Sequence, residues 1–324
     1  MTMTRNAVSR PHRFEISNDA RQLLYRLMAV ALLCVVLSLT TDAFLTANNI
    51  LNVLRQASLL FFLACGLTLV ILTAGIDLSI GANIGLSACL AATVIKASGS
   101  PLLGTLTGLA TGLVIGISNG LMVAKLRIPS FIATYGMLWV VQGLTYSYMG
   151  GQAIHGFPPG FRQIGSGYVL GVPIPVYLMI AFLLAGTIFA QRTIFGQQIY
   201  AIGSNPVAAR LTGIPVDRRL ILVYALSGAM AGVASIIFLA RLNSAEGDIG
   251  EAMSMPAIAA VLIGGASLFG GVGSLFGTFI GALILTLILN AMNLIAVNAN
   301  WQPLVTGLLV VLAVWLDLIG RRRG

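Results

Sequence analysis

The chain has 324 residues, of which 58% are hydrophobic and only 8% are charged, and its mean hydropathy is +0.97. Ordinary soluble domains carry about 25% charged residues, so this composition excludes a soluble globular enzyme. The net charge is +9, but the basic residues lie in predicted loops and tails without interleaved aromatic residues. That distribution disfavours nucleic-acid binding.

Ten apolar stretches follow one another along the chain, and about 20 apolar residues suffice to span a bilayer. They are residues 23–41, 56–74, 78–95, 101–124, 129–149, 172–190, 220–240, 253–270, 273–296 and 301–319. We therefore predict an all-α, polytopic membrane helix bundle of about ten transmembrane helices in one domain, 23–319. The polar tail 1–22 and the basic tail 320–324 flank it, and we interpret 23–41 as an uncleaved anchor. Segments 78–95 and 253–270 are short and rich in glycine, which is typical of broken or re-entrant helices.

The distribution of basic residues predicts the orientation of the bundle. Ten spans place both termini on one side of the membrane. If that side is the cytoplasm, only Arg55, Lys96, Arg162 and Arg241 lie outside, which leaves 14 of the 18 basic residues inside. Because positive charge accumulates in cytoplasmic loops, we predict that both termini and the longest loop, 191–219, are cytoplasmic.

Glycine recurs at every fourth position in the fourth predicted span, and shorter runs of this kind occur in later spans. The positions are Gly104, Gly108, Gly112, Gly116 and Gly120, then Gly228 and Gly232, then Gly273, Gly277 and Gly281. Small residues at this spacing let membrane helices approach closely. We predict tight packing within one subunit, and a subunit interface remains the alternative.

The polar residues within the spans are mostly uncharged. Asn83, Asn119, Gln142, Asn290 and Asn293 are amides, whereas ion-coupled carriers usually need ionisable groups at this depth. Amides and hydroxyls suit a neutral, hydroxyl-rich solute.

The fifth span adds Tyr135, Trp139 and Tyr146 on the helical face that carries Gln142. A sugar ring could stack on these aromatic rings. We take Tyr135, Trp139 and the five amides as the candidate translocation path. The alternative for this face of the fifth span is a packing seam with interfacial aromatic residues.

Asp77 is the candidate intramembrane acid. It follows Gly75 in the turn Gly75–Ser79 and opens a new apolar run, a position typical of an N-cap that accepts free helix N–H groups. We expect the turn to face the cytoplasm, where water keeps a carboxylate charged. The alternative role is an ion-coupling site.

The loop 191–219 contains a short predicted surface helix. Asn205 can cap it, Pro206 suits its first turn, residues 207–211 continue it and Gly213 ends it. An apolar flank on such a helix suits docking to a cytoplasmic protein. An interfacial helix lying on anionic lipid is the alternative.

The chain lacks the residues for two kinds of chemistry. Neither Lys96 nor Lys125 follows a glycine, so a phosphate-binding G-x-x-x-x-G-K-[ST] loop is excluded. His12 and His155 cannot build a multi-histidine zinc site, and we find no nucleophile–base pair for a membrane enzyme. Three cysteines, Cys34, Cys65 and Cys89, lie in apolar segments without CxxC spacing and are expected to be buried. Any ATP-driven transport must therefore use ATP and Mg²⁺ bound by another chain, and we expect no cofactor or metal in this one.

Five stretches give the chain a family resemblance, in family order along the membrane portion. They are TAGIDLSIG (73–81), NGLMVAKLRIPSFI (119–132), TIFGQQIYAIGSNPVAARLTGIP (193–215), YALSGAMAG (224–232) and IAAVLIGGASLFGGVGSLFG (258–277). In these stretches the chain resembles the permease subunits of bacterial ATP-binding-cassette importers for ribose, galactose, xylose and arabinose.

The resemblance implies an inner-membrane homodimer that imports a monosaccharide. It also implies two partners: a cytoplasmic ATPase, usually two fused nucleotide-binding halves, and a periplasmic sugar-binding protein. An ATPase-coupling element is implied at Gly203, Ser204, Asn205, Ala208, Ala209, Arg210 and Gly213, supported by the turn that contains Gly75, Asp77 and Ser79. The acidic residues Glu246, Asp248 and Glu251 would face the binding protein. An ion-coupled secondary transporter of a small polar solute is the competing hypothesis.

Overall fold

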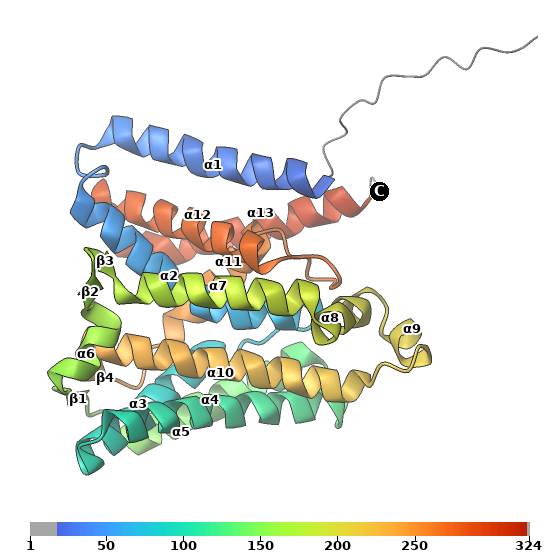
Figure 1. The fold of residues 1–324 in the computed structure, drawn as a ribbon, viewed down its shortest axis with the longest axis horizontal. Helices are drawn as coiled ribbons and strands as arrows, with labels where there is room; N and C mark the ends of the chain where they lie inside the picture. The colour runs from blue at the N-terminus through green and yellow to red at the C-terminus, as the bar shows by residue number, and fades with distance from the viewer. Residues whose placement is uncertain (1–17, 323–324) are drawn as a thin grey trace, which may run out of the picture.

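The computed structural model describes residues 18–322, which form a bundle of roughly parallel and antiparallel helices (Figure 1). The longer helices are α1 (Asn18–Thr40), α2 (Ala47–Leu72), α3 (Ile80–Ser98), α4 (Pro101–Ala124), α5 (Ser130–Met149), α7 (Ile174–Arg192), α10 (Val216–Leu242), α12 (Leu275–Leu294) and α13 (Gln302–Arg322). The shorter ones are α6 (Pro159–Ser166), α8 (Ile194–Ser204), α9 (Pro206–Leu211), α11 (Ser254–Ile263) and the 3₁₀ turns η1 (Glu251–Met253) and η2 (Ala299–Trp301). Strand β1 (Ile154–His155) pairs antiparallel with β4 (Ser244–Ala245), and β2 (Tyr168–Val169) pairs with β3 (Val172–Pro173).

Each of the ten predicted segments contains a helix. Among the described residues, seven helices are long and apolar enough to cross a membrane: α2, α3, α4, α7, α10, α12 and the segment Ala299–Ile319 that contains α13. The described apolar part of α1 and the segment Glu251–Ile263 are shorter. A polytopic helical bundle is therefore established, whereas the count of ten crossings stays a prediction.

Segments 78–95 and 253–270, both expected to be broken or re-entrant helices, differ from each other in the structure. The suspected break in 78–95 is wrong, because α3 runs without interruption over 19 residues. Segment 253–270 is broken, since α11 ends at Ile263 and the chain stays non-helical until Leu275. The physical cause is glycine: Gly265, Gly270 and Gly271 have φ values of +83°, +80° and +73°, which side chains with a Cβ rarely adopt.

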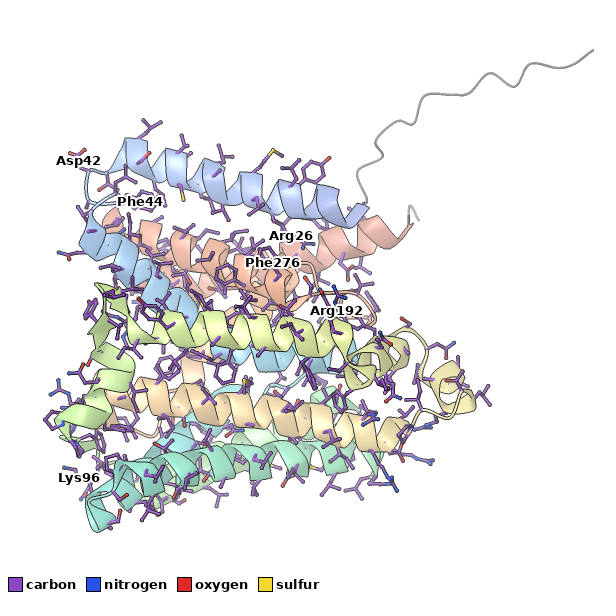
Figure 2. The ribbon with its side chains drawn as sticks, viewed as in Figure 1. Arg26, Asp42, Phe44, Lys96, Arg192 and Phe276 are labelled. Atoms are coloured by element: carbon purple, nitrogen blue, oxygen red, sulfur yellow. The ribbon has the colours of Figure 1, made fainter. Side chains whose placement is uncertain are left out.

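The two ends of the bundle carry different elements (Figure 1). The start of α1, the end of α13 and the pair α8–α9 lie at one end, and α6 with the four short strands lies at the other. Arg26 and Arg192 are labelled at the first end, and Asp42 and Lys96 at the second (Figure 2). This arrangement agrees with the prediction that loop 191–219 shares a side with both ends of the bundle. Which side is cytoplasmic remains a prediction.

The glycine repeat of α4 packs against α10, which confirms packing within one subunit. A methyl group on Gly112 would overlap the carbonyl oxygen of Gly228, and one on Gly120 would stand 2.7 Å from the Cα of Ile221. Backbone therefore meets backbone along this seam, as small residues at four-residue spacing allow. In the same way, Gly277 and Gly281 of α12 bring this helix against the backbone of α11 and Gly264.

The core lies around α2, whose second half is buried on every side. Phe61, Phe62 and Leu63 are fully buried there, and the rings of Phe61 and Phe62 meet at an interplanar angle of 61°. A helix that is apolar all round is typical of the centre of a membrane bundle. Helix α2 therefore provides the scaffold on which the functional segments described below are placed.

Candidate functional site

Helix α9 forms as the sequence predicts, because its end groups are satisfied locally. The Oδ1 atom of Asn205 accepts hydrogen bonds from the backbone N–H groups of Val207 and Ala208, each at 3.0 Å. Pro206 occupies the first turn, where its missing N–H costs nothing. The helix ends at Leu211, and Gly213 has a φ of +84° that terminates it.

Helix α9 lies at the tip of the bundle (Figure 1) and carries exposed apolar side chains. Val207 is 67% exposed and Leu211 is 84% exposed. The Nη2 atom of Arg210 lies 2.8 Å from Oδ1 of Asp217, whose Oδ2 lies 3.6 Å from Nζ of Lys125. This ion network fixes one flank of α9 to the ends of α4 and α10. The exposed apolar flank has no cover within the described residues.

The predicted coupling residues divide into an exposed and a buried group. Ser204, Asn205, Ala208, Arg210 and Gly213 are exposed. Gly203 and Ala209 are buried, so these two residues do not form part of the exposed surface of the predicted coupling element, and their role in coupling stays a prediction.

The two buried residues attach the loop to the bundle. Gly203 packs on the carbonyl group of Leu72 at the end of α2 and on Gly271, while Ala209 packs among Ile202 and Val216. Gly271 also donates its N–H to the carbonyl oxygen of Leu72, at 2.9 Å. Helix α8 is therefore held directly against the core helix, and a force on α9 would reach α2 through these contacts.

The turn at Asp77 is buried inside the bundle. Asp77 is only 1% exposed, so the expectation of a solvated cytoplasmic carboxylate is wrong. Its Oδ1 atom accepts the backbone N–H of Ser79 at 3.0 Å and the Ser79 hydroxyl at 2.7 Å, and its Oδ2 accepts the Ser227 hydroxyl at 3.1 Å. The expected capping of α3 by Asp77 is also wrong, because the N-cap residue is Ser79 without a side-chain cap bond, and Asp77 accepts the N–H of Ser79, which precedes the helix. Protein donors replace the water that the sequence led us to expect.

The turn is tied to three further helices. Asn119 of α4 donates to the Ser79 hydroxyl at 2.7 Å, and Thr134 of α5 accepts the N–H of Leu78 at 3.2 Å. Gly75 lies so close to the Tyr224 hydroxyl of α10 that a Cβ would stand 2.6 Å from it. The turn therefore joins α2, α3, α4, α5 and α10 at one point. The role of Asp77 in this turn is structural, because each of its carboxylate oxygens accepts hydrogen bonds from protein donors.

The amides proposed for the translocation path are mostly occupied within the subunit. Asn83 donates to the carbonyl oxygen of Gly112 at 3.2 Å and accepts from Ser87 at 2.9 Å. Asn290 and Asn49 exchange hydrogen bonds at 2.9 and 3.2 Å between α12 and α2. Asn83, Asn119 and Asn290 are at most 3% exposed. In this structure the three amides lie in helix packing, where the Oδ1 atom of Asn119 is buried without a hydrogen-bond partner among the described residues. Their place in the translocation path stays a prediction.

The other four residues of the predicted translocation path differ from one another in exposure. Tyr135 and Trp139 are 46% and 58% exposed on α5, so their rings remain available to a solute. Gln142 is buried and donates to the carbonyl oxygen of Gly247 at 3.3 Å. Asn293 is exposed near the end of α12 and accepts from Gln302 at 2.9 Å. Of the predicted path, the two aromatic residues alone combine exposure with a position inside a long helix.

Sequence analysis missed a segment that descends into the bundle between β4 and α11. Gly247 lies beside Gly85, and Gly250 lies against the backbone of Gly81. The Oγ atom of Ser254 then accepts the N–H of Gly81 at 3.1 Å. The only sequence signal for the contact between this segment and α3 is the glycines that both of them contain. In the same segment, Glu251 accepts a hydrogen bond from the Tyr146 hydroxyl at 3.1 Å. Tyr146 lies on the face of α5 that carries the exposed aromatic residues.

Comparisons with known proteins connect this geometry to a family. The family model described as the branched-chain amino acid transport system / permease component matches residues 49–314. The chain belongs to this permease family. The match includes α9, the Asp77 turn and the descending segment, so every candidate feature described above lies within the family's common region. As a permease component the chain is a transport protein and not an enzyme.

Individual relatives are similar along most of their length. Ribose import permease protein RbsC of Escherichia coli (strain K12) is 41% identical over 295 residues, which covers 90% of this chain and 92% of that protein. The protein of the same name from Bacillus subtilis (strain 168) is 40% identical, with 90% and 91% covered. Autoinducer 2 import system permease protein LsrC of Klebsiella pneumoniae is 35% identical, with 91% and 85% covered. No solved structure matches the chain.

Proposed function

We propose that this permease is the membrane subunit of an ATP-binding-cassette importer that carries a monosaccharide, of the pentose class, into a bacterial cell. One observation carries the proposal: relatives named for ribose import align over nine tenths of the chain at 40–41% identity. A relative named for xylose transport is 33% identical. The family name refers to amino acids, but these individual relatives are named for sugars.

The permease is a multi-pass protein of the bacterial inner membrane. Its family supports this, and so do the seven long apolar helices found within residues 18–322. An importer of this class also needs an ATPase and a periplasmic sugar-binding protein. We propose that both are separate chains, that the ATPase carries two fused nucleotide-binding halves and that the permease works as a homodimer. The lack of a phosphate-binding loop in the sequence supports a separate ATPase.

Helix α9 is the proposed docking point for the ATPase. Its exposed Val207 and Leu211 offer an apolar surface at the tip of the bundle, of the kind that an amphipathic helix lays into a groove. Residues of α8 connect this surface to the end of α2 through Gly203. Movement of the ATPase would therefore be transmitted to the core helix rather than absorbed by a loose loop.

A pair of matched variants tests the docking. Leu211→Glu places a charge on the proposed contact, and burying an unpaired charge is costly. We expect the variant to insert normally but to lose about tenfold or more of its co-purified ATPase, the scale of a central interface residue. Leu170→Glu is the control, because Leu170 is 94% exposed at the opposite end of the bundle. Equal recovery of ATPase with both variants would disprove the docking role of α9.

The substrate class needs a transport measurement. Right-side-out vesicles that contain the permease and its ATPase, with the binding protein outside, should accumulate labelled ribose or xylose only when ATP is enclosed with the ATPase. Accumulation by the permease alone, driven by an ion gradient, would instead support the competing secondary transporter. The burial of Asp77 among hydroxyl and N–H donors argues against that competitor, because a coupling site must exchange ions with water.

A further inference from the structure

A polar cavity lies at the end of the bundle opposite α9, between the connection from α1 to α2, the end of α12 and the β2–β3 hairpin. Its volume is about 460 Å³, within the range of sites that hold small molecules. Figure 2 labels Asp42 and Phe44 in the α1–α2 connection, which forms one edge of the cavity. The lining residues are Ala43, Thr46, Asn48, Asn49, Asn52, Arg55, Tyr168 and Leu294. Because most of these side chains are polar, the cavity suits a polar ligand.

Arg55 is the charged residue of this cavity. Its guanidinium stacks on Tyr168, with Cζ 5.0 Å from the ring centroid, and donates to the Tyr168 hydroxyl. Its Nε atom is buried and has no hydrogen-bond partner among the described residues. Arg241, at the end of α10, adds a second positive charge that repels it.

The protein supplies no counter-charge at this place. Within residues 18–322, no acidic side chain lines the cavity. Asp42, the acid closest to Arg55 in the sequence, is exposed and lies outside the lining. The guanidinium is therefore not neutralised by a carboxylate of the described chain, and it keeps hydrogen-bond donors for a ligand.

Two amides extend the row of donors along α2. Asn48, Asn52 and Arg55 are spaced by four and three residues, so they share one face of the first turns, and all three line the cavity. The side chains of Asn48 and Asn52 form no hydrogen bond with other described residues. Thr46 caps the helix by accepting the N–H of Asn49, so the positive end of the helix dipole also adjoins the cavity. Several N–H donors beside a positive charge suit an anion with several oxygen atoms.

We propose that this cavity binds a phosphate group, held by the Arg55 guanidinium and the side-chain amides of Asn48 and Asn52. The planar guanidinium matches the oxygens of a phosphate, and the two amides add donors for its remaining oxygens. Two sources of this group reach the end of a membrane bundle: a phospholipid head group and a free phosphate ion. The site is independent of the solute that the permease carries and of its ATPase.

The surface around the cavity favours the phospholipid as the source. Leu45 lies between the lining residues Ala43 and Thr46, and it is 63% exposed. Leu170 follows Tyr168 in the hairpin and is 94% exposed. Exposed apolar side chains of a membrane bundle face lipid, so a lipid beside them can place its phosphate in the cavity. Because the described lining has no carboxylate to pair with an ammonium group, the head group assigned is anionic, of the phosphatidylglycerol class.

Two probes applied to the purified full-length permease test the site and identify the source of the phosphate. Native mass spectrometry measures the retention of phosphatidylglycerol, phosphatidylethanolamine and phosphatidylcholine, each supplied from vesicles of that lipid alone. Equilibrium binding of radiolabelled inorganic phosphate to delipidated protein measures the free ion. We expect phosphatidylglycerol to be retained in preference to the other two lipids. Saturable binding of inorganic phosphate without a lipid preference would support the site with the free ion as its source.

A charge-removing variant and a matched control locate the binding. Arg55→Gln should weaken the binding of the retained probe about tenfold, the scale of a hydrogen bond to a charged group. Arg162→Gln is the control, because Arg162 is exposed on α6 at the same end of the bundle and outside the cavity. An equal loss in both variants would show a general effect of surface charge and would overturn the proposal.

A second pair of variants keeps the test readable if Arg55→Gln does not fold. Asn48→Ala removes an exposed amide without a hydrogen bond to described residues, and we expect about fivefold weaker binding. Asn300→Ala is its control, because Asn300 is exposed outside the cavity. Unchanged binding in Asn48→Ala and Arg55→Gln would overturn the proposal. So would a preference for phosphatidylethanolamine or phosphatidylcholine, or the binding of neither probe by the parent protein.

Discussion

At the scale of single residues, the Asp77 turn shows how a charged side chain is held within an apolar bundle. The carboxylate accepts three hydrogen bonds of 2.7–3.1 Å from Ser79 and Ser227. Bonds to a charged acceptor contribute more than neutral ones, and a buried acceptor that loses them is costly. These donors make the turn a junction of helices, which is a structural role.

Replacement of Asp77 separates that role from ion coupling. In Asp77→Asn, one acceptor oxygen becomes an NH₂ group that faces hydroxyl and N–H donors, so we expect a loss of about 1.5–3 kcal/mol of stability. The melting temperature in detergent measures this, with exposed Asp42→Asn as the control. Sugar uptake per folded molecule should persist. A fully stable variant that has lost all uptake would contradict the structural role.

At the scale of secondary-structure elements, the seam between α4 and α10 positions the rest of the molecule. Gly112, Gly116 and Gly120 bring α4 against the backbone of α10, and α10 in turn contacts the Asp77 turn through Tyr224 and Ser227. Close packing of this kind transmits displacement, because packed helices have few intermediate arrangements. Helices α4 and α10 should therefore move as one body.

The seam can be tested with two glycine substitutions. Gly112→Ala forces a methyl group onto the Gly228 carbonyl, and overpacking of this kind costs about 1–3 kcal/mol. Gly143→Ala in α5 meets nothing within 4 Å, so it should be neutral or stabilise by up to about 1 kcal/mol through helix propensity. Thermal unfolding in the same detergent compares the two. A Gly112→Ala protein as stable as the parent would exclude the seam as a rigid contact.

At the scale of the whole molecule, the bundle has two chemically distinct ends. Arg26, Arg192 and the α8–α9 pair lie at one end, and the four short strands with α6 lie at the other (Figures 1 and 2). Basic residues concentrate at the first end, as the positive-inside rule expects of a cytoplasmic face. An ATPase and a binding protein would therefore approach from opposite ends.

Orientation is measured with single cysteines in intact cells. Arg162→Cys in α6 should react with a membrane-impermeant maleimide once the outer membrane is permeable, and Arg218→Cys at the start of α10 should react only after the cytoplasm is opened. Both positions are exposed. Native Cys65 and Cys89 are buried and Cys34 is replaced by alanine in both variants. Reversed labelling would show that the bundle is inverted.

The helices and α9 could be predicted because their signals are local. Hydropathy alone placed a helix in each of the ten segments, and the Asn205 cap depends only on residues two and three positions away. The buried amides could not be placed in this way. In the sequence, Asn83 and Asn290 are polar residues in apolar spans, and the same pattern fits a pathway lining or a packing contact. Their hydrogen bonds to Gly112 and Asn49 depend on which helix packs beside them, which the sequence does not show.

The sequence by itself determined that the chain is a membrane bundle without its own ATP-binding loop, and that a capped surface helix interrupts its longest loop. These properties follow from composition and from contacts within a few residues. Only the tertiary structure decided that Asp77 is buried, that the segment ending at Ser254 reaches Gly81 and that Gly203 packs on the end of α2. Each of these depends on residues that are far apart in the chain, whose approach is set by how the helices pack.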